Sequence, residues 1–158
     1  SGRIKSMNMS LEEDINQQKF RNEFQKAGIN IIFTFNWMSE KMRSLFEEHG
    51  LTSQQFNILR ILRGAGQPLS TLQIRQRMLD KMSDTSRIVD RLILKGLVKK
   101  AVCKTDKRLV DVSITDKGKN LLAKLDEHQE EMDKVVGNLS EQEAKQLNEL
   151  LDKIRKSN

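Results

Sequence analysis

The sequence has few of the residues from which disulfides and metal sites are built. Its single cysteine, Cys103, cannot form a disulfide within the chain. Its two histidines, His49 and His128, lie far apart in the sequence, so the ligand spacing of a metal site is absent. A nucleophile with a neighbouring base, a paired-carboxylate motif and a glycine-rich phosphate loop are absent too. We therefore expect neither an enzyme nor a metal or other cofactor.

Long apolar runs are also missing. No stretch approaches the roughly 18 uninterrupted apolar residues of a membrane span, and residues 1–10 lack the apolar core of a signal peptide. We expect a cytoplasmic protein that does not associate with a membrane. Residues 1–10 are expected to be disordered, or a cloning remnant ahead of Met7 or Met9, and to lie outside the fold.

The positive charge is concentrated in the central third of the chain. The net charge is +6 over 158 residues. Between Arg63 and Arg108 the chain holds 12 lysines and arginines against 4 acids, whereas the rest holds 16 bases and 18 acids. The whole positive excess therefore comes from this segment, as expected for a surface that binds phosphates.

Helical periodicity and capping signals divide the chain into segments. One apolar stripe recurs at steps of three and four from Phe20 to Leu45, which predicts a long first helix. The next helices are predicted to start at Thr52 and Ser70, each followed three residues later by a glutamine that completes a capping box. Ser83 is predicted to cap a fourth helix that ends before Gly96.

The period then changes. Residues 97–102 and 109–114 are rich in β-branched residues and flank the polar turn 104–107, which predicts a β-hairpin with a charged tip. Thr115 should cap a fifth helix that extends to Val136, and Ser140 a sixth that extends to Ile154. Short helices followed by another helix across a tight connection are typical of a helix-turn-helix.

Two motifs in this order resemble the MarR family of bacterial regulators. Residues 85–100, TSRIVDRLILKGLVKK, are similar to the family's recognition helix and the strand after it. Residues 106–118, DKRLVDVSITDKG, are similar to the family's wing signature, although Lys107 stands where that signature has its middle arginine. In the third predicted helix, Arg75 stands where the family usually has alanine. The resemblance implies a mainly α fold with a small β-hairpin wing, a winged helix-turn-helix. It implies a DNA-binding lobe at 51–115, with 11–50 and 116–158 forming the dimerisation region.

The resemblance also indicates candidate DNA-binding residues. The recognition helix would present Ser83, Asp84, Thr85, Ser86, Arg87 and Arg91. A plainer interpretation is that Ser83 and Asp84 only cap the helix and that Arg87 pairs with an acid. The wing would present Lys104, Asp106, Lys107 and Arg108, with Asp106 orienting Arg108 toward a narrow minor groove. Phosphate contacts are expected from Arg75, Arg77, Lys99 and Lys100.

The function that follows is sequence-specific binding of double-stranded DNA by a homodimer that regulates transcription, as a repressor acting on a pseudo-palindromic operator. The alternative is a winged-helix module that binds another protein. Trp37, Met38 and Met42 are candidates for a pocket that binds a small-molecule effector, although packing in a core or a dimer explains them as well. Cys103 is either a redox sensor or an inert strand residue.

Overall fold

The computed structural model describes residues 10–102, 104–108 and 110–156. These residues form two compact units that divide between Lys41 and Met42, and each unit is described by itself. Within the described ranges, no helix combines the length and the apolar character needed to cross a membrane. Cys103 lies outside the described residues, so the choice between its two interpretations stays open.

The first unit holds the short helix α1 (Leu11–Asp14) and most of α2 (Glu23–Glu48). The apolar stripe predicts that the long helix begins near Phe20, but α2 begins at Glu23, one turn later. Just before this start, the Asn22 side chain accepts a hydrogen bond from the backbone N–H of Gln25 (2.9 Å). This bond satisfies a donor at the start of α2, as an N-cap residue does. An ion pair between Glu12 and Lys26 joins α1 to α2.

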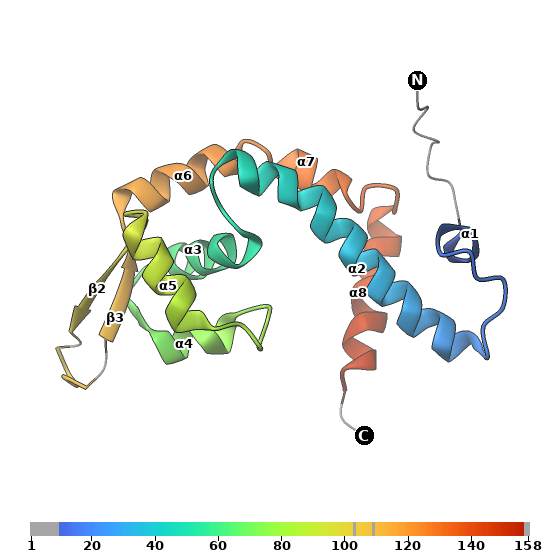
Figure 1. Ribbon diagram of the computed structural model, residues 1–158, viewed down its shortest axis with the longest axis horizontal. Helices are drawn as coiled ribbons and strands as arrows, with labels where there is room; N and C mark the ends of the chain where they lie inside the picture. Colours follow the sequence, from blue (N-terminus) through green and yellow to red (C-terminus); the bar gives the residue numbers. More distant parts are fainter. Residues whose placement is uncertain (1–9, 103, 109, 157–158) are drawn as a thin grey trace. The chain divides into compact units, whose positions relative to one another are not determined.

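After the end of α2, the first part of the second unit holds three helices and a small sheet. The helices are α3 (Ser53–Ala65), α4 (Thr71–Arg77) and α5 (Thr85–Leu94). The capping boxes predicted at Thr52 and Ser70 are confirmed, each with both reciprocal hydrogen bonds. The strands β2 (Val98–Val102) and β3 (Val110–Ile114) form the predicted hairpin and project from these helices (Figure 1).

A third strand was not predicted. Leu69 and Ser70 form β1, which pairs antiparallel with β3, so the strand order is β1-β3-β2. Leu69 is buried opposite Val112, and both belong to the core. This pairing fixes the base of the hairpin against the start of α4. The result is a winged helix-turn-helix, as expected from the sequence.

The core of this unit is built from side chains that the helices turn inward. It joins the apolar sides of α3, α5 and α6 (Asp116–Asp126) to the inner face of the sheet. The largest fully buried side chains are Ile58, Leu59, Leu69, Ile74, Met78, Leu92, Leu122 and Leu125. Burial of each such aliphatic side chain contributes roughly 1.5–3 kcal/mol, so this cluster holds the winged-helix elements in place.

The predicted helix from Thr115 to Val136 is instead two helices, α6 and α7 (Gln129–Lys134). The backbone N–H groups of Glu127 and His128 bond to the carbonyls three residues earlier, which tightens the turn and ends α6. No glycine or proline marks this break. His128 lies at the break with its ring centroid 6.0 Å from that of His49, so the fold brings together two residues that are distant in sequence.

An ion pair ties α3 to the end of α6. Arg63 donates to both oxygens of Asp126 at 2.7 and 3.1 Å. These bonds hold the pKa of the Asp126 carboxyl below its usual range. A carboxyl with a lowered folded pKa adds stability that is present at neutral pH and is lost as the pH falls through that pKa.

The last helix, α8 (Glu141–Ile154), begins at the predicted capping box of Ser140 and Glu143.

Two glycines in helices should respond in opposite ways to alanine. A Cβ at Gly118 would lie 2.4 Å from the carbonyl oxygen of Leu97 and 2.7 Å from a side-chain carbon of Ile114. Gly118→Ala should therefore lower the free energy of unfolding by about 1–3 kcal/mol through overpacking. A Cβ at Gly64 meets nothing within 4 Å, so Gly64→Ala should raise it by about 0.5–1 kcal/mol. Urea denaturation of both variants measures the two effects, and equal responses would contradict this packing.

Candidate nucleic-acid interface

Helix α5 has one buried side and one exposed side. Ile88, Val89 and Leu92 are buried in the core. Ser86, Arg87 and Arg91 are exposed. Because side chains three and four residues apart share a helix face, burial of the apolar residues holds the polar ones toward solvent. The predicted recognition helix therefore presents a serine and two arginines together.

The residue that caps α5 is Asp84, and the prediction that Ser83 does so is wrong. The Asp84 carboxylate accepts a hydrogen bond from the backbone N–H of Arg87 at 3.3 Å. Ser83 is buried at 8% exposure, and its hydroxyl donates to the Asp80 carbonyl at 2.8 Å. Ser83 is thus used in the turn before the helix. The plainer interpretation of Asp84 as a cap is confirmed, while its contact with a base stays a prediction.

Four arginines of α4 and α5 have no acidic partner among the residues that the structure describes. Neither Arg87 nor Arg91 forms an ion pair with any residue that the structure describes. The same holds within the described ranges for Arg75 and Arg77 of α4, which are also exposed. The interpretation that Arg87 pairs with an acid therefore finds no support. These charges are available to an external anion.

Two of the predicted phosphate contacts stand on β2 and differ in their surroundings. Lys99 is exposed and, among the described residues, forms no ion pair. Lys100 donates to a carboxylate oxygen of Asp90 on α5 at 2.8 Å. This pair is exposed at the surface, where such pairs contribute about 0–1 kcal/mol. Lys100 can therefore exchange Asp90 for a phosphate at little cost.

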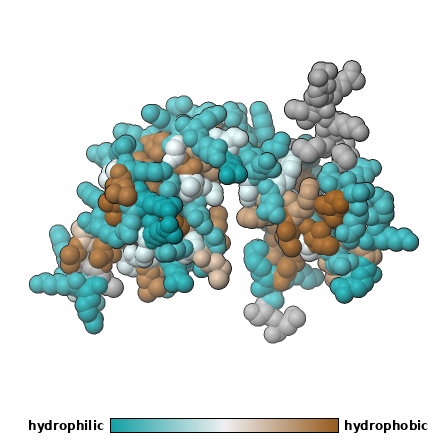
Figure 2. Space-filling view, viewed as in Figure 1, coloured by the Kyte–Doolittle hydropathy of each residue, from teal (hydrophilic) through white to brown (hydrophobic). Residues whose placement is uncertain are grey.

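The wing residues surround the β2–β3 turn. Nε and one terminal nitrogen of Arg108 donate to the two carboxylate oxygens of Asp106 at 3.0 and 3.1 Å. These bonds hold the pKa of Asp106 below its usual range and raise that of Arg108. The Arg108 side chain is 90% exposed, so Asp106 orients a guanidinium that remains open to solvent. Lys104 and Lys107 are exposed nearby, and Figure 2 shows hydrophilic side chains projecting at this tip.

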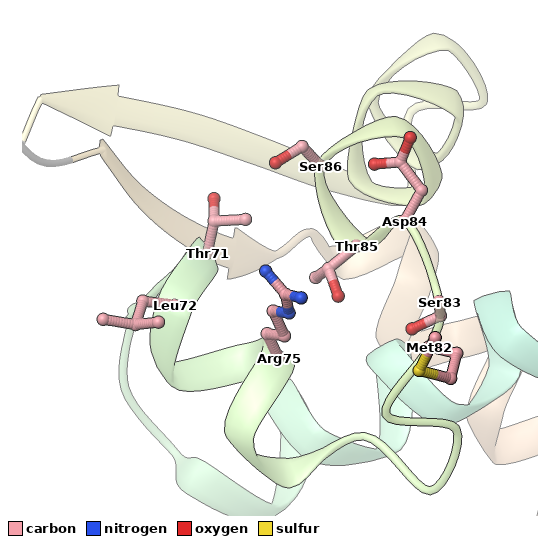
Figure 3. A pocket seen from close by; sticks show the side chains of 8 residues that line it. All are labelled: Thr71, Leu72, Arg75, Met82, Ser83, Asp84, Thr85 and Ser86. Carbon is pink, nitrogen blue, oxygen red and sulfur yellow. The ribbon is translucent and has the colours of Figure 1, made fainter.

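A groove of about 490 Å³ separates α4 from the start of α5 (Figure 3). It is lined by Thr71, Leu72, Arg75, Met82, Ser83, Asp84, Thr85 and Ser86. Sequence reasoning named five of these as separate candidates, but Thr71, Leu72 and Met82 were missed. No pattern within one helix signals them, because the groove exists only where two helices meet. Thr85 lies in the groove wall, and its side chain is buried.

The three candidates for an effector pocket are half-buried on α2. The Lys41 ammonium lies 5.3 Å from the centroid of the Trp37 ring, a cation–π contact within the first unit. Met42 packs against the core of the second unit. The assignment of Trp37, Met38 and Met42 to a pocket stays a prediction.

The fold and the interface define a winged helix-turn-helix protein, and comparison with known proteins specifies the family. A model of the MarR family matches residues 49–109. The HTH-type transcriptional regulator MhqR of Bacillus subtilis is 31% identical over 119 residues, which cover 74% of this chain and 81% of MhqR. The chain belongs to the MarR family of transcriptional regulators.

Solved structures agree with this fold. A mutant MarR from E. coli, in complex with operator DNA, superposes with a TM-score of 0.77 at 23% identity, covering 88% of this chain and 100% of that one. The organohalide-sensing regulator RdhR, bound to 2,4-dichlorophenol, has a TM-score of 0.78 at 18% identity, covering 88% of this chain and 85% of that one. At these identities the likeness describes the fold.

The capping role of Asp84 can be separated from a role in reading DNA. Asp84→Ala should lower the free energy of unfolding by about 0.5–2 kcal/mol, because the N–H of Arg87 loses its acceptor. Asp84→Ser should keep most of that stability, since serine caps nearly as well. Thermal and urea unfolding of the two variants make the comparison. If Asp84→Ala and Asp84→Ser lowered the free energy of unfolding equally, the capping hydrogen bond would not explain the stability that Asp84 adds to α5.

Proposed function

We propose that the chain binds double-stranded DNA sequence-specifically as a homodimer and represses transcription by occupying a promoter. The observation that carries this proposal is the exposed side of α5, where Ser86, Arg87 and Arg91 stand without acidic partners in the described chain, beside the charged wing. A MarR solved with operator DNA shares the fold, and this supports the same use of the surface here.

The major groove admits an α-helix, and the first turn of that helix meets the base edges. In the proposed complex the N-terminal turn of α5 enters this groove. Arg87 is then our candidate for a forked contact with a guanine, which presents two acceptors on one edge. Ser86 is exposed one residue earlier and suits a phosphate or a base edge. Asp84 has one carboxylate oxygen engaged by the cap and one left to accept from a cytosine amino group.

The wing contacts the adjacent minor groove in this proposal. A narrow minor groove has an enhanced negative potential, which attracts an arginine. Arg108 is already extended into solvent, and its bonds to Asp106 limit its directions. The remaining exposed cations, Arg75, Arg77, Lys99, Lys104 and Lys107, would contact phosphates and so set position rather than sequence.

Dimerisation is proposed because α8 exposes apolar side chains that a single chain leaves in water. Leu147, Leu150 and Ile154 are 40%, 53% and 62% exposed, and they recur at helical spacing on α8. A contiguous exposed apolar stripe is typical of a protein interface. A symmetric dimer would place two copies of α5 about one helical turn apart on DNA, roughly 34 Å. Residues 11–50 and 116–158 remain our proposed dimerisation region.

An effector is the final part of the proposal. A small molecule that favours one arrangement of the two lobes would lower DNA affinity by shifting the population, without contacting the DNA-binding surface. The phenol bound by RdhR, which shares this fold, supports a search among small aromatic compounds. Trp37, Met38 and Met42 are the residues we propose for that contact.

Salt dependence and one wing variant test DNA binding together. The affinity for duplex DNA should fall with salt on a log–log slope of about 0.9 per phosphate contact. Arg108→Ala should weaken binding by about 1–3 kcal/mol, whereas Arg155→Ala, which removes the same charge from the end of α8, should change it little. Fluorescence anisotropy measures both. Specific binding of another protein, with no preference among duplex sequences, would favour the alternative function of a protein-binding module. Unchanged DNA affinity in Arg108→Ala would exclude the wing from the DNA contact.

The dimer is tested by one substitution on α8. Leu150→Glu should yield a monomer, because a carboxylate would be buried in the proposed interface. The matched control is Gln142→Glu, which adds the same charge to α8 away from the apolar stripe. Light scattering at micromolar concentration gives the mass of each. A wild-type monomer, or a Leu150→Glu dimer as stable as the wild type, would contradict this interface.

A further inference from the structure

We propose that the groove between α4 and α5 holds one phosphate of the DNA backbone, with Arg75 as the ligand and Thr85 as the residue that positions Arg75. This inference rests on the proposed function, because its ligand is a phosphodiester of duplex DNA. It adds a defined phosphate site that joins the two helices. From the sequence alone, Arg75 is one of several residues expected to contact phosphates, and Thr85 is one residue of the predicted recognition helix.

The first observation is an unsatisfied hydroxyl. Thr85 is 3% exposed, and its Oγ1 is the one buried side-chain polar atom without a hydrogen-bond partner among the described residues. A buried polar group without a partner lowers stability, and native proteins contain few of them. Valine has nearly the same shape and would fill this position without that cost. The hydroxyl therefore calls for a partner that moves into place when a ligand binds.

The second observation is the position of Arg75. Both residues line the same groove, and Figure 3 shows the Thr85 side chain next to the guanidinium of Arg75. Arg75 is exposed and, within the described chain, forms neither an ion pair nor a side-chain hydrogen bond. A guanidinium has five N–H donors. One can be accepted by Thr85 Oγ1 while two others fork onto phosphate oxygens.

The start of α5 supplies further donors at the same place. The backbone N–H groups of Thr85 and Ser86 belong to the first turn of a ten-residue helix, where no carbonyl within the helix can accept from them. They carry the positive end of the helix dipole, which favours an anion. The groove thus combines a free guanidinium, two backbone donors and a hydroxyl that lacks a partner.

Asp84 limits where the anion can sit. Its carboxylate accepts from the N–H of Arg87 and is drawn on the far side of Thr85 from Arg75 (Figure 3). Repulsion from this carboxylate places the phosphate at the Arg75 end of the groove. Arg75 stands on α4, and the first helix of a helix-turn-helix crosses the DNA backbone while the second enters the groove. The ligand is therefore a backbone phosphate rather than a base.

The test combines stability with affinity. Thr85→Val should leave the free energy of unfolding equal or higher, because the unsatisfied hydroxyl is removed, yet lower the affinity for duplex DNA about tenfold. Thr85→Ser, which restores a hydroxyl, should stay within about twofold of the wild type in affinity. Arg75→Gln should also lose about tenfold. The double variant should lose little more than either single one, because both changes remove the same contact.

Arg77→Gln is the matched control, since it removes a neighbouring cation of α4 that does not line the groove. The loss of DNA affinity in Arg77→Gln should add fully to the loss of DNA affinity in Thr85→Val. A scan of single neutral methylphosphonates along the bound duplex should find one position per half-site that weakens the wild type and has no effect on Arg75→Gln. Full additivity of Thr85→Val with Arg75→Gln, or no such position, would overturn the proposal.

A free phosphate ion and a phosphate of the DNA backbone present similar charged oxygens to the groove. A melting experiment with inorganic phosphate distinguishes these two ligands. Inorganic phosphate should raise the melting temperature of the wild type only slightly beyond chloride at equal ionic strength. Marked stabilisation by phosphate that Arg75→Gln abolishes, with no sensitive methylphosphonate position, would assign the groove to a small anion and overturn the proposal. If the wild type did not bind duplex DNA at all, the proposed function would fail first. Wild-type binding with an unaffected Thr85→Val would remove this inference alone.

Discussion

Burial of one side of α5 constrains every contact that its other side can make. Ile88, Val89 and Leu92 are fixed in the core, where α5 packs against α3, α4 and β2. Turning the helix by one residue would expose this apolar stripe and carry a charged side chain inward, which costs far more than any surface contact returns. The directions of Ser86, Arg87 and Arg91 are therefore a consequence of core packing, set before any partner is met.

The charges around α5 fall into two groups with different physical roles. Arg75, Arg77, Arg87 and Arg91 have no acidic partner in the described chain, so binding an anion requires no ion pair to break. Lys100 and Arg108 each hold a nearby carboxylate. At an exposed surface such a pair is weak and screened by salt. It therefore orients its cation without preventing exchange for a phosphate.

Local signals in the sequence predicted most of the fold, and non-local contacts account for what was missed. The capping boxes at Thr52, Ser70 and Ser140 are confirmed because their bonds span only three residues. Strand β1 was missed because two residues carry no period, and only pairing with β3 makes them a strand. The end of α6 was missed because no glycine or proline marks it. Ser83 lost the capping role to Asp84 because the Asp80 carbonyl engages its hydroxyl.

The candidate site, like the fold, was predicted from the sequence only in part. The arginines and the wing were named from motifs, whereas the groove between α4 and α5 needed the packing of two helices to become visible. The central claim is that this surface, presented twice by a dimer, selects DNA by sequence. The most direct measurement is the enrichment of duplexes bound by the purified chain from a random pool. The account predicts one pseudo-palindromic consensus with half-sites about one helical turn apart. A pool that stays random, or a consensus without two-fold symmetry, would contradict it.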